Sequence, residues 1–580
     1  MKTILQSLRS LRKITFLGIA LGFANTPPVA AFERTWLCGS GYWDTESCWS
    51  NSYYYPVPSR SDSAALTQSD SIDRVVTYRQ INNTYVYSYI STLTVDATGI
   101  GTMTLYQSQD SLATNTEWLG YSGFGAYSQS GGSNSTTFMY LGQESTGKGV
   151  YNLTGGTLTA SVEVIGRNGS GSFTQSGGLN SSTNNFVLAA YNNTSRGAYN
   201  LSGTGRLETS NADIGYYGIG IFNQVGASHS VGSRMTLGVQ GGSVGEYHLS
   251  GNGSLSVGIG LTIGNGGRGV FIQDSGIVSV GDYVAIGGNS SYMINGGTLT
   301  ASRIYNGYGP GSLHVNGGTL DIGNGDGLID VDSLYIGSTT GANGSHTLSG
   351  NGSLITGTTI LGASGHGEFI QNGGTHTISG ALVIADANEG TGKYVLGGGV
   401  LDSRDVIVND GGLFEFSGGS LFVNNYFGDL INNGGSLSSG SPLEVTNIFG
   451  NFTQLAGELD LNIGGRNIGE YGALNVDGIA SLGGKMSVSF SDLGYGLFSP
   501  QAGDTFDILT AESLVGHFDY LSLLALGDGL DWSVNYLTDA VGTTDILRLS
   551  VVSAVPVPAS IWLLVSGLLG LGGIVKRKAP

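Results

Sequence analysis

The 580-residue sequence has few charged residues, only two cysteines, and no long stretches of strong helix formers between its two ends. Charged residues make up 11% of the chain, against about 25% in a typical soluble protein. The 100 glycines follow no strict triplet period, which excludes a collagen helix. The hydrophobic share of 40% argues against disorder, because the chain has apolar material to bury.

Basic residues are scarcer still once the targeting segments at the two ends are set aside. Those segments, 1–31 and 553–580, hold seven of the 23 Lys and Arg and none of the 42 Asp and Glu. The body between them carries 16 basic and 42 acidic residues, a net charge of −26. Such a surface repels phosphate backbones, so we expect no nucleic-acid partner. Acidity of this kind keeps an extracellular protein soluble.

A repeat of about 20 to 26 residues fills the centre of the chain. Each unit starts on an aromatic or apolar residue, as in Tyr151-Asn-Leu-Thr-Gly-Gly and Phe173-Thr-Gln-Ser-Gly-Gly. The unit starts are Tyr127, Tyr151, Phe173, Tyr199, Phe222, Tyr247, Phe271, Tyr292, Leu313, His346, Phe369, Tyr394 and Phe414. A second landmark is a Leu or Ile followed by Gly120, Gly142, Gly166, Gly215, Gly238, Gly264, Gly287, Gly337 and Gly362. Two registers that advance together indicate a structural repeat.

This repeat predicts an all-β fold, an elongated parallel β-helix or solenoid with capped ends. About 22 residues form one coil of two or three short strands, with Gly and Asn at the corners. Coils stack about 4.8 Å apart, so the aromatic starts should form one ladder and the Leu or Ile before Gly another. A β-propeller is the alternative fold, but its blades need about 40 to 50 residues each.

The N-terminal part of the body, 32–100, predicts a cap. It contains Trp36, Trp43 and Trp49 together with Cys38 and Cys48, the only cysteines in the chain. In an oxidising compartment, two Cys ten apart beside aromatic residues favour a disulfide that staples the end of the solenoid. A redox or metal site would need closer Cys pairing or further ligands, and neither is visible.

From 452 to 552 the repeat gives way to longer alternating strands. Leu474-Asn-Val-Asp-Gly, Leu482-Gly-Gly and Gly503-Asp-Thr-Phe-Asp-Ile-Leu resemble the closing segment of autotransporter-type β-helical passengers. Fewer than 30 residues follow this segment, too few for an outer-membrane translocator barrel. The resemblance therefore implies the fold, with the solenoid in 101–451 and a closing β module in 452–552, and it does not imply that secretion route.

Residues 1–31 read as a secretory signal peptide. Four basic residues precede an apolar stretch from Ile14 to Phe23, and Val29-Ala30-Ala31 offers small residues to signal peptidase. About ten apolar residues are too few to span a bilayer comfortably. We expect export by Sec.

The last residues, 553–580, combine three ordered features. Val555-Pro556-Val557-Pro558-Ala559-Ser560 leads into an apolar run from Ile561 to Val575, and Lys576, Arg577 and Lys578 follow. Counted from Ala559, the run is 17 residues long, which is at the lower limit for one transmembrane helix. The basic residues should stop transfer and stay cytoplasmic, so the body lies on the periplasmic side.

This tail resembles the PEP-CTERM sorting signal in its VPLPA variant. The resemblance rests on the Pro-containing motif, the Gly-rich apolar segment from Ser566 to Gly573 and the basic end; Val557 stands where the variant has Leu. It implies recognition and processing by an exosortase, a membrane-embedded cysteine-protease-like enzyme of bacteria that make exopolysaccharide.

The strongest metal candidate is the acidic segment that lies within the one unusually long repeat unit. Its candidate ligands are Asp321, Asn324, Asp326, Asp330 and Asp332. Their oxygens suit Ca²⁺. The pattern fails the EF-hand spacing, however, and a solvated insertion loop accounts for it equally, so we assign no metal and expect no cofactor.

A catalytic role would need carboxylates gathered on one face of the solenoid. The only dense charged group is Asp402, Arg404, Asp405 and Asp410. We assign no catalytic residue, and expect a protein that is not an enzyme.

These observations predict a non-catalytic exported structural or surface protein. Its expected partners are an exosortase, the inner membrane that holds it facing the periplasm before processing, and exopolysaccharide or biofilm matrix afterwards. Its final location is the cell surface or the extracellular matrix. Two alternatives stay open: an adhesin that binds a specific surface ligand, and a β-helix polysaccharide lyase or hydrolase.

Overall fold

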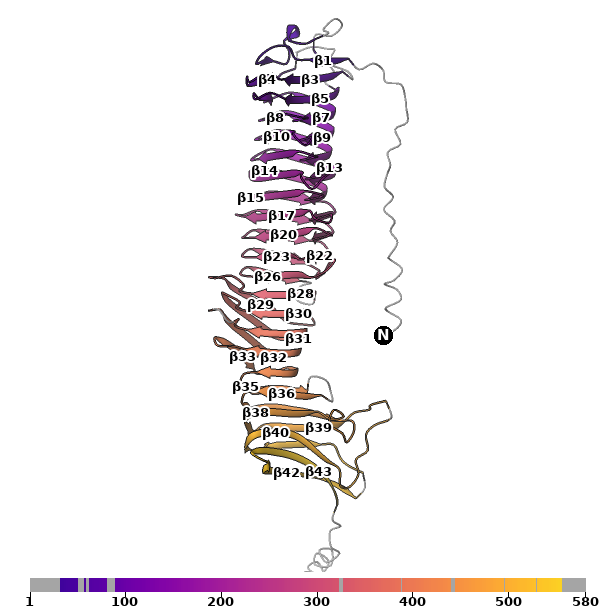
Figure 1. The fold of residues 1–580 in the computed structure, drawn as a ribbon, viewed down its shortest axis with the longest axis vertical. Helices are drawn as coiled ribbons and strands as arrows, with labels where there is room; N and C mark the ends of the chain where they lie inside the picture. Colours follow the sequence, from indigo (N-terminus) through magenta and orange to yellow (C-terminus); the bar gives the residue numbers. More distant parts are fainter. Residues whose placement is uncertain are drawn as a thin grey trace, which may run out of the picture.

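The computed structural model describes residues 32–50, 57–58, 62–80, 89–322, 327–386, 389–439, 444–494, 496–527 and 529–554. These residues form a long rod in which short strands are stacked like rungs, from β1 at one end to β43 at the other (Figure 1). The rod is a β-solenoid of about 16 coils, which corresponds to a length of roughly 75 Å. Within this part of the chain the only helical element is one 3-10 turn, η1 (Glu46–Cys48). The all-β solenoid expected from the repeat is confirmed.

The first part of the rod runs from the N-terminal cap to β26, the last strand before the order of the faces changes along the chain. Its strands are β1 (Glu33–Thr35), β2 (Gly41–Tyr42), β3 (Ser63–Gln68), β4 (Arg74–Tyr78), β5 (Tyr89–Ala97), β6 (Met103–Gln107), β7 (Ser111–Leu119), β8 (Phe124–Gln129), β9 (Ser133–Leu141), β10 (Lys148–Leu153), β11 (Thr157–Ile165), β12 (Ser170–Gln175), β13 (Leu179–Leu188), β14 (Arg196–Ile214), β15 (Ile219–Val231), β16 (Arg234–Leu237), β17 (Val244–Ser250), β18 (Ser254–Val257), β19 (Gly260–Ile263), β20 (Arg268–Gln273), β21 (Ile277–Val280), β22 (Tyr283–Ile286), β23 (Ser290–Ile294), β24 (Thr298–Ala301), β25 (Arg303–Asn306) and β26 (Gly311–Val315).

The second part continues to the C-terminal cap. Its strands are β27 (Thr319–Ile322), β28 (Leu328–Ile336), β29 (Asn343–Leu348), β30 (Ser353–Leu361), β31 (His366–Ile384), β32 (Thr391–Val408), β33 (Gly412–Phe416), β34 (Ser420–Phe427), β35 (Leu430–Ser439), β36 (Val445–Phe449), β37 (Phe452–Ile463), β38 (Ala473–Leu482), β39 (Lys485–Phe490), β40 (Thr505–Gly516), β41 (Tyr520–Leu523), β42 (Leu530–Val541) and β43 (Thr544–Ser553).

Each coil has three faces. In one coil, β10 forms the first face, residues 157–160 of β11 the second, and residues 162–165 the third. Each face pairs in parallel with the same face of the coils before and after it. Alternate side chains point inward and are buried, so a single apolar core runs the length of the rod.

Two of the expected ladders are present in the core. On the first face Tyr151 pairs in register with Phe173, and their ring centroids lie 4.7 Å apart. At the end of the third face Leu141 pairs with Ile165. The glycine after this aliphatic position turns the corner with a left-handed backbone, as at Gly166 (φ 77°), where a Cβ atom would meet the carbonyl oxygen of Arg196 in the next coil. This explains the Leu-Gly and Ile-Gly landmark.

The expectation of one unbroken aromatic ladder is wrong between Leu313 and His346. Leu313 pairs with Leu334, which belongs to the strand that ends in the aliphatic landmark before Gly337 and not to an aromatic unit start. His346 starts a new ladder with Phe369. The long unit contains one strand more than the other units. Residues 328–331 of β28 pair with β25 and fill the third face, and 333–336 then fill the first face of the next coil. The next aromatic strand, β29, therefore falls on the second face, and the sequence repeat is rotated by one face for the rest of the rod.

The C-terminal end closes with antiparallel strands. Parallel pairing continues without a break past 452, through β37 and β38 to β41. β43 then pairs antiparallel with β40 and with β42, as is visible at the yellow end of the rod (Figure 1). An antiparallel hairpin cannot be continued by another coil, so it covers the open edge of the solenoid.

Candidate functional site

The predicted sorting motif begins directly beyond the last strand of the rod. Ala554, the last described residue, donates its backbone N–H to the carbonyl oxygen of Gly529 at 2.7 Å. The chain is thus held in the C-terminal cap up to the residue before Val555. The motif Val555–Ser560, the expected membrane helix and Lys576–Lys578 lie outside the described residues, as does the expected signal peptide 1–31. In the part of the chain that is described, no helix is long and apolar enough to cross a membrane.

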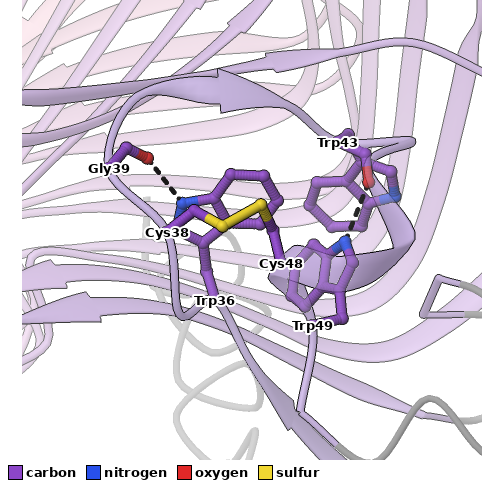
Figure 2. Close-up of a disulfide and its surroundings, with 6 residues drawn as sticks. All are labelled: Trp36, Cys38, Gly39, Trp43, Cys48 and Trp49. Atoms are coloured by element: carbon purple, nitrogen blue, oxygen red, sulfur yellow. Dashed lines mark hydrogen bonds between the residues drawn. A yellow bond between two sulfur atoms is a disulfide. The ribbon is translucent and has the colours of Figure 1, made fainter.

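A disulfide joins Cys38 to Cys48 in the N-terminal cap. Figure 2 shows it beside three tryptophans, and the indole N–H groups of Trp36 and Trp49 donate to backbone oxygens at 2.8 Å. The ring of Trp49 lies edge to face against Trp36 and Trp43, at 5.2 and 4.8 Å between centroids. The buried indoles therefore keep their polar groups satisfied while they cover the end of the apolar core.

A chain of buried polar side chains runs through the core, and the sequence analysis did not identify it. The hydroxyl of Tyr151 donates to Oε1 of Gln129 in the preceding coil at 2.6 Å. Burial raises the pKa of Tyr151 well above its usual value, so this hydroxyl keeps its proton. Equivalent bonds join Tyr127 to Gln107, Tyr199 to Gln175, Tyr247 to Gln224, Tyr292 to Gln273 and Tyr394 to Gln371.

The Tyr hydroxyls receive a second bond from the neighbouring face. Nδ2 of Asn180 lies 3.1 Å from the hydroxyl of Tyr199, and Nδ1 of His229 lies 3.1 Å from that of Tyr247. Burial lowers the pKa of His229 to about 3, so the imidazole is neutral at physiological pH. These side chains bond to one another inside the core, where only Oδ1 of Asn180 among them lacks a partner. They form part of the packing of the core and have no access to a ligand.

Two carboxyl groups are fully buried in the same core. Glu163 accepts from Nδ2 of Asn180 at 3.0 Å, and Glu117 accepts from Asn134 at 3.1 Å. Burial raises the pKa of Glu163 to about 8 and that of Glu117 to about 7. A shifted carboxyl group often indicates a catalytic acid. Here both groups are fully enclosed, and their nearest polar partners are side chains of the core, so they have no path to a substrate.

The charged group suggested for catalysis is divided over different parts of the coil. Asp402 lies exposed on the third face, whereas Asp405 accepts from Arg404 at 3.0 Å and from Asn425 at 2.8 Å around the next corner. Asp410 lines an open corner cavity of about 760 Å³ together with Asp386 and Glu389. The cavity is acidic, but the structure does not bring all the members of the charged group together in it.

The candidate calcium ligands are also divided. Asp321 ends the second face in β27 and Asp330 lies on the third face in β28, where Asn306 donates to its Oδ1 at 3.4 Å. The backbone N–H of Asp332 donates to Asn306. Asn324 and Asp326 lie outside the described residues. Among the residues that are described, no three His, Cys, Asp or Glu side chains are grouped closely enough to hold a metal ion.

An exposed group of aromatic and basic side chains, which the sequence analysis also missed, lies on one corner of the rod. This corner joins the third face of a coil to the first face of the next. The group, termed here the aromatic corner, consists of Trp118, Tyr121, Tyr140, Arg167, Tyr191 and Tyr217. The signal in the sequence was an aromatic residue directly before the aliphatic ladder residue, at Trp118 and Tyr140, or an aromatic or Arg residue two or three positions after it, at Tyr121, Arg167, Tyr191 and Tyr217.

Comparison with known proteins does not assign this chain to a group: no family model and no curated protein matches it. The chemistry of the chain must therefore be inferred from its own residues. Inside the rod the polar groups bond to one another, and outside it the aromatic corner and the acidic corner cavity are the surfaces with distinct chemistry. Recognition of a polymer along the rod is the activity that such a surface can support.

Proposed function

We propose that this chain is a non-catalytic structural protein of the bacterial surface. It is exported by Sec and held by its tail in the inner membrane, facing the periplasm. An exosortase then processes the tail, and the rod becomes associated with exopolysaccharide or biofilm matrix at the cell surface. The proposal includes no cofactor, no metal and no nucleic acid.

The observation that carries this proposal is the junction between the rod and the tail. The closing hairpin holds the backbone up to Ala554, and the sorting motif begins at the next residue. Such a junction supports a tethered rod, because a site near Ala559 would lie within a few residues of a folded end. Pro556 and Pro558 would keep that short connection extended.

The closed ends and the filled core support a structural role. The disulfide-linked tryptophan cap covers one end of the solenoid, and the antiparallel hairpin covers the other. Solenoids need such caps because unpaired strand edges recruit other chains. A rod closed at both ends, with buried side chains that bond to one another, is suited to act as a soluble, rigid spacer.

The test follows the chain through export in its native host. Cells that carry the wild-type chain, or a version in which Val555–Ser560 are replaced by Gly and Ser, are separated into membrane, cell-surface and matrix fractions. We expect the wild type in the surface and matrix fractions with a shortened C-terminus. We expect the replaced version to remain full-length in the inner membrane. Equal distribution of both forms would reject the proposal.

A further inference from the structure

Exposed rings occupy the turn of the aromatic corner in three of five consecutive coils, at positions where the fold does not require them. Tyr121, Tyr191 and Tyr217 are 40%, 56% and 43% exposed. They occupy the turn after the aliphatic ladder residue, where other coils have residues without a ring, such as Gln240 between β16 and β17 and Asn265 between β19 and β20. Since those coils turn the same corner, the rings are not needed for the turn.

Tyr121 and Tyr191 are held in place by contacts with a stacked column of Trp118, Tyr140 and Arg167. Trp118 and Tyr140 stack with centroids 4.4 Å apart. The guanidinium of Arg167 lies 4.8 Å from the ring centre of Tyr140 and 4.7 Å from that of Tyr191, and it donates to Gln143 at 2.6 Å. Cation–π contacts of this kind hold flexible side chains in one arrangement. A ligand that binds here would therefore lose little free energy in ordering the surface.

Positive charge borders the same corner. Lys148 and Arg196 are exposed at the starts of β10 and β14, and their backbones lie directly beside the turns at Gly120 and Gly166. Neither side chain, nor that of Arg167, forms an ion pair with a carboxylate among the residues that the structure describes. Elsewhere on the rod Arg206 and Lys393 are paired with Glu residues.

The turns of this corner between Leu119 and Ile219, with the strand ends that adjoin them, carry Lys148, Arg167 and Arg196 against one exposed carboxylate, Glu144, and the partly buried Asp213. The body as a whole has a net charge of −26. This corner is therefore locally cationic on an acidic molecule, and a local positive strip attracts an anionic partner. A partner as densely charged as a nucleic acid would be repelled by the rest of the surface.

We infer that the aromatic corner binds an acidic, carboxylate-bearing polysaccharide that lies along the rod axis. Tyr rings offer an apolar body for the C–H faces of sugars and a hydroxyl for hydrogen bonds. Lys148, Arg167 and Arg196 pair with the carboxylates. Coils repeat about every 4.8 Å, so an extended polysaccharide that lies along the rod axis meets the rings and cations of several coils. This inference rests on the proposed function and names the surface that contacts the matrix.

The binding test uses the purified full-length chain in detergent, with EDTA present to exclude cation bridging. Alginate, a polymer of uronic acids, is the probe, and binding is measured by thermophoresis with alginate oligosaccharides of increasing length. We expect saturable binding that strengthens until the oligosaccharide spans the corner. We expect at least tenfold weaker binding to dextran, which carries no charge, and to polyglutamate, which has carboxylates but no sugar rings.

Two variants remove the rings and the charges separately. Tyr121→Ser with Tyr191→Ser and Tyr217→Ser, and Lys148→Ser with Arg196→Ser, should each weaken alginate binding at least tenfold. Two controls are matched in exposure: Tyr520→Ser removes a ring that is 74% exposed on β41 near the C-terminal end of the rod, and Arg206→Ser with Arg303→Ser removes exposed cations elsewhere. Both controls should bind as the wild type does. All replaced side chains are exposed, so circular dichroism should be unchanged.

The inference is overturned by an absence of saturable alginate binding, by equal loss in the control variants, or by equal binding to polyglutamate or single-stranded DNA. Its failure is distinguishable from failure of the proposed function. A chain that is processed and retained in the matrix but does not bind alginate overturns the inference alone. A chain that binds alginate through this corner but is never processed or exported overturns the proposed function alone.

Discussion

The hydroxyl of Tyr199 donates a 2.6 Å hydrogen bond to Oε1 of Gln175, and the two side chains come from adjacent coils. One coil further on, Phe222 stacks on Tyr199, and the position of the Gln is taken by Leu201. A Tyr in the aromatic ladder therefore lies beside a Gln of the preceding coil, and a Phe in the ladder lies beside a Leu of the preceding coil. The same holds for Leu153 with Phe173, Leu249 with Phe271, Gln273 with Tyr292, Leu348 with Phe369, Gln371 with Tyr394 and Leu396 with Phe414.

This pairing predicts that Gln175→Leu destabilises the rod by about 1–3 kcal/mol, because the buried hydroxyl of Tyr199 loses its acceptor. The double variant Gln175→Leu with Tyr199→Phe should recover most of this loss, since it reproduces the natural Leu201 and Phe222 pair. Urea denaturation followed by circular dichroism measures both. A double variant as unstable as Gln175→Leu alone would contradict the pairing.

The buried carboxyl groups predict a fall in stability with rising pH. Burial raises the pKa of Glu163 to about 8 from its ordinary value of 4.5. The folded chain therefore keeps a proton that the unfolded chain releases, and the stabilisation present at low pH is lost as the pH rises through about 8. Between pH 6.5 and 9 the wild type should lose up to about 2 kcal/mol relative to Glu163→Gln. The exposed Glu208→Gln is the control and should follow the wild type.

The opposite dependence is expected at acid pH. Burial lowers the pKa of His229 and of His376 to about 3. The unfolded chain therefore binds protons that the folded core excludes, and stability is lost as the pH falls from about 6.5 through 3. His229→Asn should reduce this loss, since Asn180 fills the equivalent position in another coil. Denaturation midpoints at pH 6.5 and 4.5 test this; an unchanged acid dependence would argue against it.

The N-terminal cap predicts a local effect of disulfide removal. Replacing Cys38 and Cys48 together by Ser should lower the free energy of opening of β1 and β3 by about 2–4 kcal/mol. Hydrogen exchange should show faster exchange in these strands and unchanged protection at β20. Because the freed edge is unpaired, sedimentation should also show association at high concentration. Full protection of β1 in the variant would show that the tryptophans close the cap without the disulfide.

The tail predicts a shortened mature protein. In a host with the matching exosortase, intact-mass measurement should show loss of about the last 20 residues, counted from near Ala559. In a host without it, the full-length chain should remain in the inner membrane. Replacing Lys576, Arg577 and Lys578 by Ala should impair retention before processing. An unprocessed C-terminus in the native host would reduce the segment to an ordinary anchor.

The absence of catalysis is a prediction of its own. The purified chain should release no sugars from acidic or neutral polysaccharides, with or without calcium, because Asp402 and Asp405 lie on different faces of the coil and Asp405 is already paired with Arg404. Reducing-sugar and unsaturated-product assays measure hydrolase and lyase activity. Turnover that is abolished by Asp402→Asn or Asp405→Asn would establish the enzyme alternative.

The sequence predicted the solenoid because each coil repeats its own pattern: an aromatic start, a polar corner, and an aliphatic residue before Gly. It did not predict which face each strand occupies. That depends on how many strands precede it, and the additional strand at β28 alters the count after Leu313. The long interval between Leu313 and His346 was the only available signal.

The buried network and the aromatic corner were missed for a different reason. Both depend on contacts between coils, and a unit read by itself does not show its neighbour. Gln175 alone resembles an ordinary polar strand residue, and it is recognisable as buried only beside Tyr199. In the same way Arg167 is unremarkable until Tyr140 and Tyr191 lie on either side of it.

The matching of Tyr to Gln and of Phe to Leu also constrains how such a gene can change in length. Between Tyr151 and Tyr292 the coils alternate strictly, so recombination that removes one coil would set a Tyr hydroxyl over a Leu, or a Phe over a Gln. Removal or duplication of two coils restores every pair. The shortest segment that can be inserted or deleted without breaking these pairs is therefore two coils, about twice the sequence repeat. Relatives of different length should differ by even numbers of coils in this region.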